Sequence, residues 1–537
     1  MFSDIDLSYR SLTFFSNKLI DQLDFRDKYM RLAEVIPWHK LSEKVKDCYS
    51  DIGRPSLSPR LMMGLEIVKN FENLSDERTL ELYRTNPYIQ YFCGEVEFQN
   101  KVPCTPSSLS TFRSKTADFL PQEIFQISVQ LHSYEAMEED VIIDTTCQEK
   151  NITFPTDVKL LSKVIIRCRK LATECDVKLN NTFKNEVKEI LRTIRFEKGK
   201  DKTEEVRKAR KRLITIAGIL VREIERKMSD DQKAANNDDL TIYKKVVDQS
   251  KPEKKMTAAE KTNEIKELQN IVNSCIEYAK IYGVQIRQIE KYEEKTENQI
   301  SQYNNAKGRG REKGYADCKR GLEKTANYFI RKLEEKLTDS QLSEIEDDIN
   351  SFKEKLKKKP KERRIYSLHE PNVICITKGK AGKKHEYGSK ASIAITKTSG
   401  VIVGAVNFQE NRHDSDTVQA TVEHIVETRS VKPKNVYCDR GYRGAQEKNQ
   451  DINVFIPSAP TSSTTDEEKT EAIKNFGRRS SIEPVIGHIK NDFRLAKTHL
   501  KGAIGDKVNL LLACAAYNFK KYWNKIIQRQ KIQIQEG

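Results

Sequence analysis

The chain has 537 residues, of which 37% are hydrophobic and 32% charged. This length is too great for a single hydrophobic core, so two to four structural units are expected. Lysine and arginine number 95 against 79 aspartate and glutamate, and the net charge of +16 favours a polyanionic partner such as nucleic acid. No apolar run is long enough to span a membrane, and acids among the first residues argue against a signal peptide. The 11 cysteines contain no Cys-x-x-Cys pair, so neither a disulfide scaffold nor a zinc site is expected.

Residues 1–135 are predicted to form a helical domain. Apolar side chains recur at helical spacing in 61–71, which follows Ser and Pro residues that commonly begin helices. Further short helices are expected at 75–83, which opens with Ser75, and at 109–119, which follows Thr, Pro and Ser residues. Short helices joined by tight turns occur in helix-turn-helix proteins, so we interpret this region as a DNA-binding domain. The pattern alone is weak, because many small helical domains have no such role.

A change of pattern follows this domain. A short β-branched run at 141–143 predicts a buried strand with Asp144 at its carboxyl end. From 161 to 364 the chain is strongly charged, and apolar residues recur at helical spacing, for example in 203–227 and 264–282. We interpret 161–364 as a charged helical insertion of antiparallel hairpins or a coiled-coil-like arm, most of whose charges lie on solvated faces.

Strand patterns return after the insertion. The predicted elements are strands at 373–377, 389–396 and 401–408, a helix at 416–427, short strands at 436–438 and 454–456, and helices at 482–492 and 506–523. Without the insertion, this order fits an α/β fold with a ribonuclease-H-like mixed sheet. The catalytic domain would comprise 136–160 and 365–525, and 526–537 would be a C-terminal tail.

Three acidic residues lie where such a sheet places its chemistry. Asp144 and Asp439 each follow a short apolar strand, and Glu483 begins a late helix. Two aspartates and a glutamate brought together could hold two divalent ions, and hard oxygen ligands suit Mg²⁺ or Mn²⁺ better than zinc. Each residue also has a purely structural interpretation. Either aspartate could begin a turn, and Ser480 with Glu483 matches a capping box.

The surroundings of these acids resemble the DDE transposases of bacterial insertion sequences. The similar motifs are DTTCQEKNI from Asp144, VYCDRGYRG around Asp439 and RRSSIEPVIGHIK around Glu483. The family branch carries Tyr, two residues, Arg, three residues, Glu, six residues and Lys. Arg479, Glu483 and Lys490 match that spacing, whereas Phe476 replaces the tyrosine and so loses its hydroxyl. Residues 57–94 also resemble the helical amino-terminal domain of these transposases.

The resemblance implies a role for each matching residue. Asp144, Asp439 and Glu483 would be the catalytic ligands of two Mg²⁺ or Mn²⁺ ions. Arg479 and Lys490 would contact DNA phosphates near the scissile bond. Arg440 and Arg443 are further candidates for phosphate contacts, since guanidinium groups bind phosphate in a bidentate manner, but surface salt bridges are an equal alternative.

Two local questions remain open in the sequence. Residues 479–490 could form one helix with Arg479, Glu483 and Lys490 on one face, or a helix could start at Ser481 with Glu483 and Pro484 in its first turn. The pair His413-Asp414 is comparable to histidines near the site in this family. We nevertheless favour a loop histidine without a catalytic role.

The implied function is that of a transposase which binds the terminal inverted repeats of its element as double-stranded DNA. Metal-activated water would cut the ends, and the freed 3′ hydroxyl would attack target DNA. Pairing two ends implies a homodimer or higher oligomer on DNA, and the expected location is the bacterial cytoplasm at the nucleoid, away from membranes. Two alternatives are a catalytically silent, repurposed DNA-binding protein, against which the intact carboxylates argue, and a ribonuclease-H-like nuclease that cleaves without joining.

Overall fold

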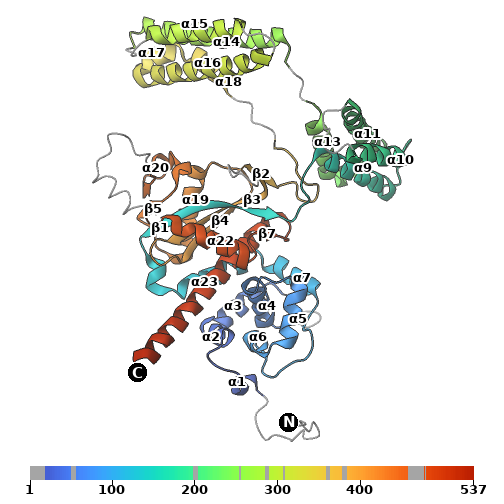
Figure 1. Cartoon of the computed structure of the whole chain (residues 1–537), viewed down its shortest axis with the longest axis vertical. Coiled ribbons are helices and arrows are strands. Elements are labelled where there is room, and N and C mark those ends of the chain that lie inside the picture. The colour runs from blue at the N-terminus through green and yellow to red at the C-terminus, as the bar shows by residue number, and fades with distance from the viewer. Residues whose placement is uncertain are drawn as a thin grey trace. The chain divides into compact units, whose positions relative to one another are not determined.

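The structure is a computed structural model, which describes residues 18–49, 56–196, 204–252, 256–284, 289–305, 309–357, 363–377, 384–457, 477 and 479–536. Its internal contacts divide the chain into two compact units (Figure 1). The first unit comprises residues 1–247 and 365–537, and the second comprises 248–364. Among the described residues, no helix combines the length and the apolar character needed to cross a membrane.

A mixed sheet of seven strands, counted over the described residues, lies at the centre of the first unit (Figure 1). The strands are β1 (Asp140–Lys150), β2 (Ile374–Thr377), β3 (His385–Thr396), β4 (Ile402–Phe408), β5 (Asn435–Tyr437), β6 (Asn453–Phe455) and β7 (Lys497–Thr498). β1 pairs antiparallel with β3, which pairs antiparallel with both β2 and β4. On its other edge β1 pairs in parallel with β5 and β7, and β6 continues in parallel from β5. The combination of helices with this sheet agrees with the predicted α/β class.

The first strand is longer than its apolar run suggested. We predicted that it ends at Asp144, but β1 continues to Lys150, and Asp144 therefore lies inside the strand. The physical reason is its partner, because β3 pairs with β1 without interruption from Val141 to Glu149. Backbone pairing to a long neighbouring strand thus extends β1 beyond the residues whose side chains indicate a strand.

Helices precede and cover the sheet. Those before it are α1 (Leu19–Gln22), α2 (Lys28–Val35), α3 (Trp38–Lys46), α4 (Pro59–Phe71), α5 (Asp76–Thr85), α6 (Pro87–Phe92), α7 (Pro106–Thr116) and α8 (Leu120–Gln130). The side chains of Ser75, Asn86 and Thr105 accept hydrogen bonds from the first turns of α5, α6 and α7, which explains where these helices begin. The helices from α2 to α8 share one continuous hydrophobic core with the sheet.

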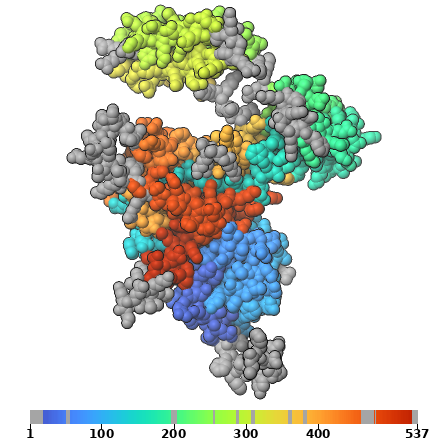
Figure 2. Space-filling model, viewed as in Figure 1, coloured from blue at the N-terminus to red at the C-terminus, as the bar shows by residue number. Residues whose placement is uncertain are grey.

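The later helices of the first unit pack on the sheet. They are α19 (Val418–Arg429), α20 (Ala445–Lys448), α22 (Ile482–Asp492) and α23 (Gly502–Glu536). α19 packs against β3 and β4, α22 packs against β1, and α23 contacts β4, α4 and α8. Figure 2 shows the blue amino-terminal helices and the red carboxyl-terminal helices meeting at the surface, which agrees with their shared core.

The segment between β1 and β2 is helical, as its periodicity predicted. Its helices are α9 (Asp157–Glu174), α10 (Lys184–Phe196), α11 (Glu204–Lys227), α12 (Asp230–Ala235), α13 (Asn237–Ser250), α14 (Ala258–Ile281), α15 (Ile289–Asn305), α16 (Arg309–Lys336), α17 (Asp339–Glu344) and α18 (Glu346–Leu356). They contain two separate hydrophobic cores, one around Leu213 and Leu220 and one around Leu322 and Phe329. The second core belongs to the unit 248–364. Each group of helices therefore buries its own apolar faces.

Candidate active site

Asp144 lies at an opening in the sheet. On the edge of β1 that faces its parallel neighbours, β5 pairs with residues 140–142 and β7 with residues 149–150. Between these two stretches, the described residues provide no parallel partner for β1, so the chain diverges beside Asp144. Such a divergence at the carboxyl end of parallel strands is where α/β sheets form their binding crevices.

Asp439 comes to the same opening from β5. The pairing of Ile142 with Tyr437 places Asp439, two residues farther along, near the level of Asp144. The carboxylate Oδ1 of Asp439 accepts a hydrogen bond of 2.7 Å from the N–H of Gly441 and so begins the 3₁₀ helix η3 (Arg440–Tyr442). Asp439 therefore does begin a turn, but it is half-buried, and its charge also acts on Asp144.

The charge of Asp439 acts on Asp144. Burial raises the pKa of Asp144 to about 6, although the N–H of Thr145 donates to its carboxylate at 2.7 Å and opposes the shift. The negative charge of Asp439 raises the pKa of Asp144 further. A half-buried carboxylate beside a second carboxylate is a site that attracts a cation.

A third aspartate, which the sequence analysis did not place in the site, joins this pair. The Asp414 carboxylate accepts a hydrogen bond of 2.7 Å from the Thr145 hydroxyl and forms an ion pair of 2.5 Å with Lys390. Asp414 begins the 3₁₀ helix η2 (Asp414–Thr417), and the ring of His413 caps that turn by accepting from the N–H of Ser415. The position of Asp414 in the loop that follows β4, at another strand end, was the sequence signal that could have found it.

Glu483 approaches the site on a helix that packs against β1. The 3₁₀ helix η4 (Arg479–Ser481) precedes α22, which starts at Ile482 and has Glu483 and Pro484 in its first turn. Of the two helix geometries left open by the sequence, the one with a late start is therefore confirmed. The capping box is not formed, because Ser481 occupies the cap position and makes no side-chain capping hydrogen bond.

Arg479 connects Glu483 with the aspartates. Its guanidinium donates to the Glu483 carboxylate at 3.4 Å, and its positive charge lowers the pKa of Asp144. The Glu483 side chain is 64% exposed, so it can change its rotamer freely. The structure thus brings Asp144 and Asp439 together and leaves Glu483 paired with Arg479. Within the described residues, no three His, Cys, Asp or Glu side chains lie close enough together to hold a metal ion.

The other predicted DNA contacts surround this opening. Arg440 and Arg443 are exposed in and after η3, next to Asp439. Among the residues that the structure describes, none forms an ion pair with Arg443. Lys490 lies on α22, seven residues after Glu483 and half-buried. Phe476, which replaces the family tyrosine, lies outside the described residues.

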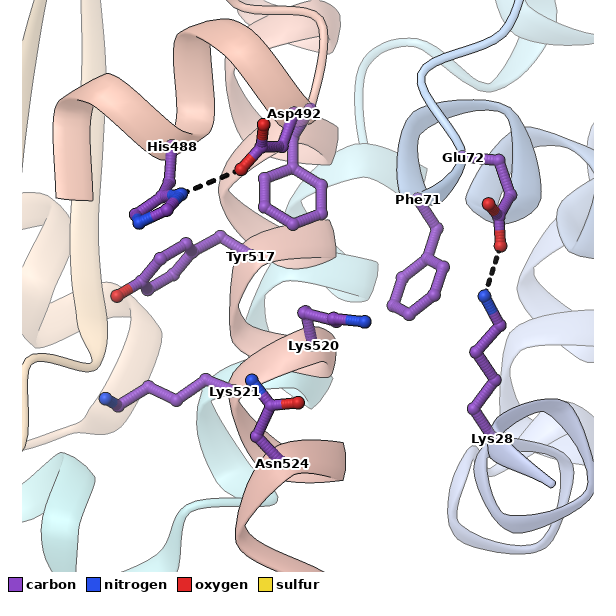
Figure 3. A pocket seen from close by; sticks show the side chains of 10 residues that line it. Lys28, Phe71, Glu72, His488, Asp492, Tyr517, Lys520, Lys521 and Asn524 are labelled. Atoms are coloured by element: carbon purple, nitrogen blue, oxygen red, sulfur yellow. Dashed lines mark hydrogen bonds and ion pairs between the residues drawn. The ribbon is translucent and has the colours of Figure 1, made fainter. Parts of the chain in front are cut away.

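A pocket of about 480 Å³ lies beside α22 and α23 (Figure 3). Two pairs of side chains contact each other within the pocket, Lys28 with Glu72 at 2.5 Å and His488 with Asp492 at 2.7 Å. Its other lining residues are Phe71, Phe493, Tyr517, Lys520, Lys521 and Asn524. Neither Lys520 nor Lys521 forms an ion pair with a described residue, and burial lowers the pKa of Lys521. The two lysines are therefore available to an anionic group such as a phosphate.

Comparisons with known proteins bear on both parts of the first unit. The family model of a transposase domain (DUF772) matches residues 17–115, and that of the transposase DDE domain matches residues 374–519. Asp439 and Glu483 lie in the second match, whereas Asp144 lies outside both. The chain is also 33% identical over 174 residues, which are 32% of its length, to an uncharacterized protein, ORF8 in the nfe locus, of Rhizobium meliloti, and covers 84% of that relative. No solved structure matches the chain.

Proposed function

Because this chain belongs to the DDE transposases of insertion sequences, we propose that its site cuts the ends of a transposable element and joins them to target DNA. The chain is a DNA transposase, with DNA as its partner. The proposed steps are hydrolysis of a phosphodiester at each end, followed by attack of the freed 3′ hydroxyl on a target phosphodiester. Each step exchanges one bond to phosphorus for another, so no covalent enzyme intermediate is needed.

The observation that carries this proposal is the placement of Asp144 and Asp439 at the divergence of β1, β5 and β7. The two residues are 295 positions apart in the chain but share an electrostatic environment. Carboxylates crowded in this way bind a phosphate anion only when cations lie between them. The arrangement therefore supports an active site that acts on a phosphodiester with bound cations.

The residues of the site fit divalent ions by their donor chemistry. All the candidate ligands are carboxylates, which suit Mg²⁺ or Mn²⁺, and the neighbouring charge of Asp439 disfavours ionised Asp144 in the absence of a cation. Asp144, Asp439 and Glu483 would hold two ions, with Glu483 released from its contact with Arg479 by a change of rotamer. The ions would supply positive charge to the attacking and leaving oxygens.

The cationic residues would hold the DNA. Arg479 and Lys490 on one side and Arg440 and Arg443 on the other would contact phosphates flanking the scissile bond. The helices of 1–135 would read the sequence of the inverted repeat, consistent with their match to a transposase domain. Two transposon ends would be paired by at least two copies of the chain.

The catalytic fold is proposed to be ribonuclease-H-like. The spatial order β4-β3-β1-β5-β6, with the first three strands antiparallel and the last three parallel, supports this assignment. The helical segment 161–364 is then an insertion between the first strand and the second. A nuclease that cleaves without joining would use the same site, and only an assay of strand joining separates the two activities.

Replacement of Asp439 tests the proposal. We expect Asp439→Asn to abolish nicking and joining of DNA that carries the element's ends, because the amide removes a charge that holds the cations. The end DNA should still be bound with nearly wild-type affinity. The measurement is product formation with and without Mg²⁺, together with a gel-shift assay of the same DNA.

Asp451→Asn is the matched control, since Asp451 is exposed and pairs only at the surface with Lys432 at 3.3 Å. This control should cut and join like the wild type. The assignment of the site is wrong if Asp439→Asn nicks the DNA at the wild-type rate. If the wild type nicks but never joins, the protein is a nuclease rather than a transposase of this mechanism.

A further inference from the structure

Asp414 lies in the site, although it is not one of the three proposed metal ligands, Asp144, Asp439 and Glu483. Both the Thr145 hydroxyl and the Lys390 ammonium contact the same oxygen, Oδ1 of Asp414. The Lys390 side chain is only 8% exposed, and its ammonium also donates to the carbonyl of Arg412 at 2.6 Å. Two donors therefore hold this one oxygen, so the Asp414 carboxylate cannot easily change its rotamer.

The second oxygen of Asp414 faces the turn after β5. A Cβ atom added to Gly441 would lie 3.2 Å from Oδ2 of Asp414 and 2.9 Å from Oδ1 of Asp439. Both carboxylates thus lie beside the position that a side chain at Gly441 would occupy, and such a side chain would displace at least one of them. Asp414 connects Thr145, the neighbour of Asp144, with the turn that begins at Asp439.

A separate observation indicates that a ligand belongs at this place. Tyr442 is fully buried, yet its hydroxyl has no hydrogen-bond partner among the described residues. The charged forms of Cys438, Asp144, Asp414 and Asp439 all raise the pKa of this hydroxyl, after the larger effect of burial. A buried hydroxyl without a partner is costly, so a group that enters the site beside these carboxylates is its natural partner.

We propose that Asp414 is a positioning residue of the active site. Held by Lys390, its carboxylate binds the Thr145 hydroxyl and lies against the turn at Gly441, and so sets the separation and orientation of Asp144 and Asp439 for divalent ions. This inference rests on the proposed function, because it assigns Asp414 to the same site. It predicts that Asp414 affects the binding of metal ions even when no DNA is present.

Titration of the full-length protein with Mn²⁺ by calorimetry tests this role without requiring activity. Asp414→Asn removes the charge, and Thr145→Val removes the donated hydrogen bond while keeping the shape of the side chain. Both variants should bind Mn²⁺ about 10- to 100-fold more weakly, and cleavage should need correspondingly more metal. Thr145→Ser keeps the hydroxyl and should therefore bind Mn²⁺ with most of the wild-type affinity.

Asp416→Asn is the matched control, because Asp416 lies in the same 3₁₀ turn but pairs with Lys448 at 2.5 Å. It should bind Mn²⁺ like the wild type. The role of Asp414 is refuted if Asp439→Asn abolishes Mn²⁺ binding while Asp414→Asn and Thr145→Val leave it unchanged. If Asp439→Asn also binds Mn²⁺ normally, the proposed site itself is wrong, and Asp414 loses its role with it. Should Asp414→Asn fail to fold by circular dichroism, Thr145→Val decides.

Discussion

His424 on α19 shows how burial controls the charge of a single side chain. Its Nδ1 accepts a hydrogen bond of 3.2 Å from the N–H of Ala405, and its Nε2 lies 2.8 Å from Oε1 of Gln122. This arrangement needs a neutral ring with the proton on Nε2. Burial lowers the pKa of His424 to about 4, and the positive charge of Lys507 adds to the effect. His424 thus joins α8, α19 and β4 only while it is uncharged.

The first unit should therefore lose stability in mild acid. Between the usual histidine pKa of about 6.5 and the folded-state value, the unfolded chain binds a proton that the folded chain does not. The free energy of unfolding should fall by about 2 kcal/mol from pH 7 to pH 5 on account of His424. Urea unfolding at both pH values measures this loss. His424→Gln should show a smaller pH dependence, whereas the exposed His39→Gln should keep that of the wild type; equal slopes for all three proteins would contradict the prediction.

At the scale of elements, a buried charge network holds α4, α5 and α7 together. Arg113 on α7 donates to both oxygens of Glu66 on α4, at 2.7 and 3.1 Å, and to Asp76 on α5 at 2.8 Å. Lys69 completes the network with an ion pair to Asp76 at 2.6 Å. The Glu66 side chain is 3% exposed, so its charge depends on Arg113 for compensation.

Arg113→Met should destabilise the helical amino-terminal region strongly. The substitution leaves Glu66 buried without its partner, which costs about 3–5 kcal/mol in comparable buried pairs. Arg84→Met is the matched control, because Arg84 pairs with Glu81 at the surface and should contribute less than about 1 kcal/mol. Chemical denaturation of both variants gives the two free energies. A loss for Arg113→Met no larger than that for Arg84→Met would show that water already compensates Glu66.

For the whole molecule, the separate cores predict separate unfolding transitions. Phe329 is fully buried in the core of 248–364, and Phe519 is almost fully buried in the core that contains the sheet. Each unit encloses its apolar side chains without contribution from the other core. Loss of one core should therefore leave the other folded.

Phe329→Ala should lower the stability of 248–364 by about 3–5 kcal/mol and leave the first unit unchanged. Phe519→Ala should instead destabilise the part of the first unit that contains the sheet and leave 248–364 unchanged. Hydrogen exchange followed by mass spectrometry locates the affected amides in each variant. Faster exchange throughout both units in either variant would show that the chain unfolds cooperatively as one body.

Much of this architecture can be predicted from the sequence because it depends on local residue patterns. The caps at Ser75 and Thr105 and the apolar period of 203–227 indicate the helices, and the β-branched runs indicate the strands. The motifs around Asp439 and Glu483 likewise indicated the family that the later comparisons support. These features depend on neighbours within a few residues, so one chain is enough to reveal them.

Tertiary structure alone decided the rest. The true length of β1 depends on pairing with β3, more than 200 residues away, and not on the side chains of β1. The approach of Asp414 to Thr145 joins a turn to a strand 269 positions away, and the contact between Arg479 and Glu483 depends on where α22 begins. Local residue patterns thus predicted most of the longer elements and the family of the chain. Which charges meet at the opening beside Asp144 was decided by long-range packing, because electrostatic contacts depend on distance in space and not on distance along the chain.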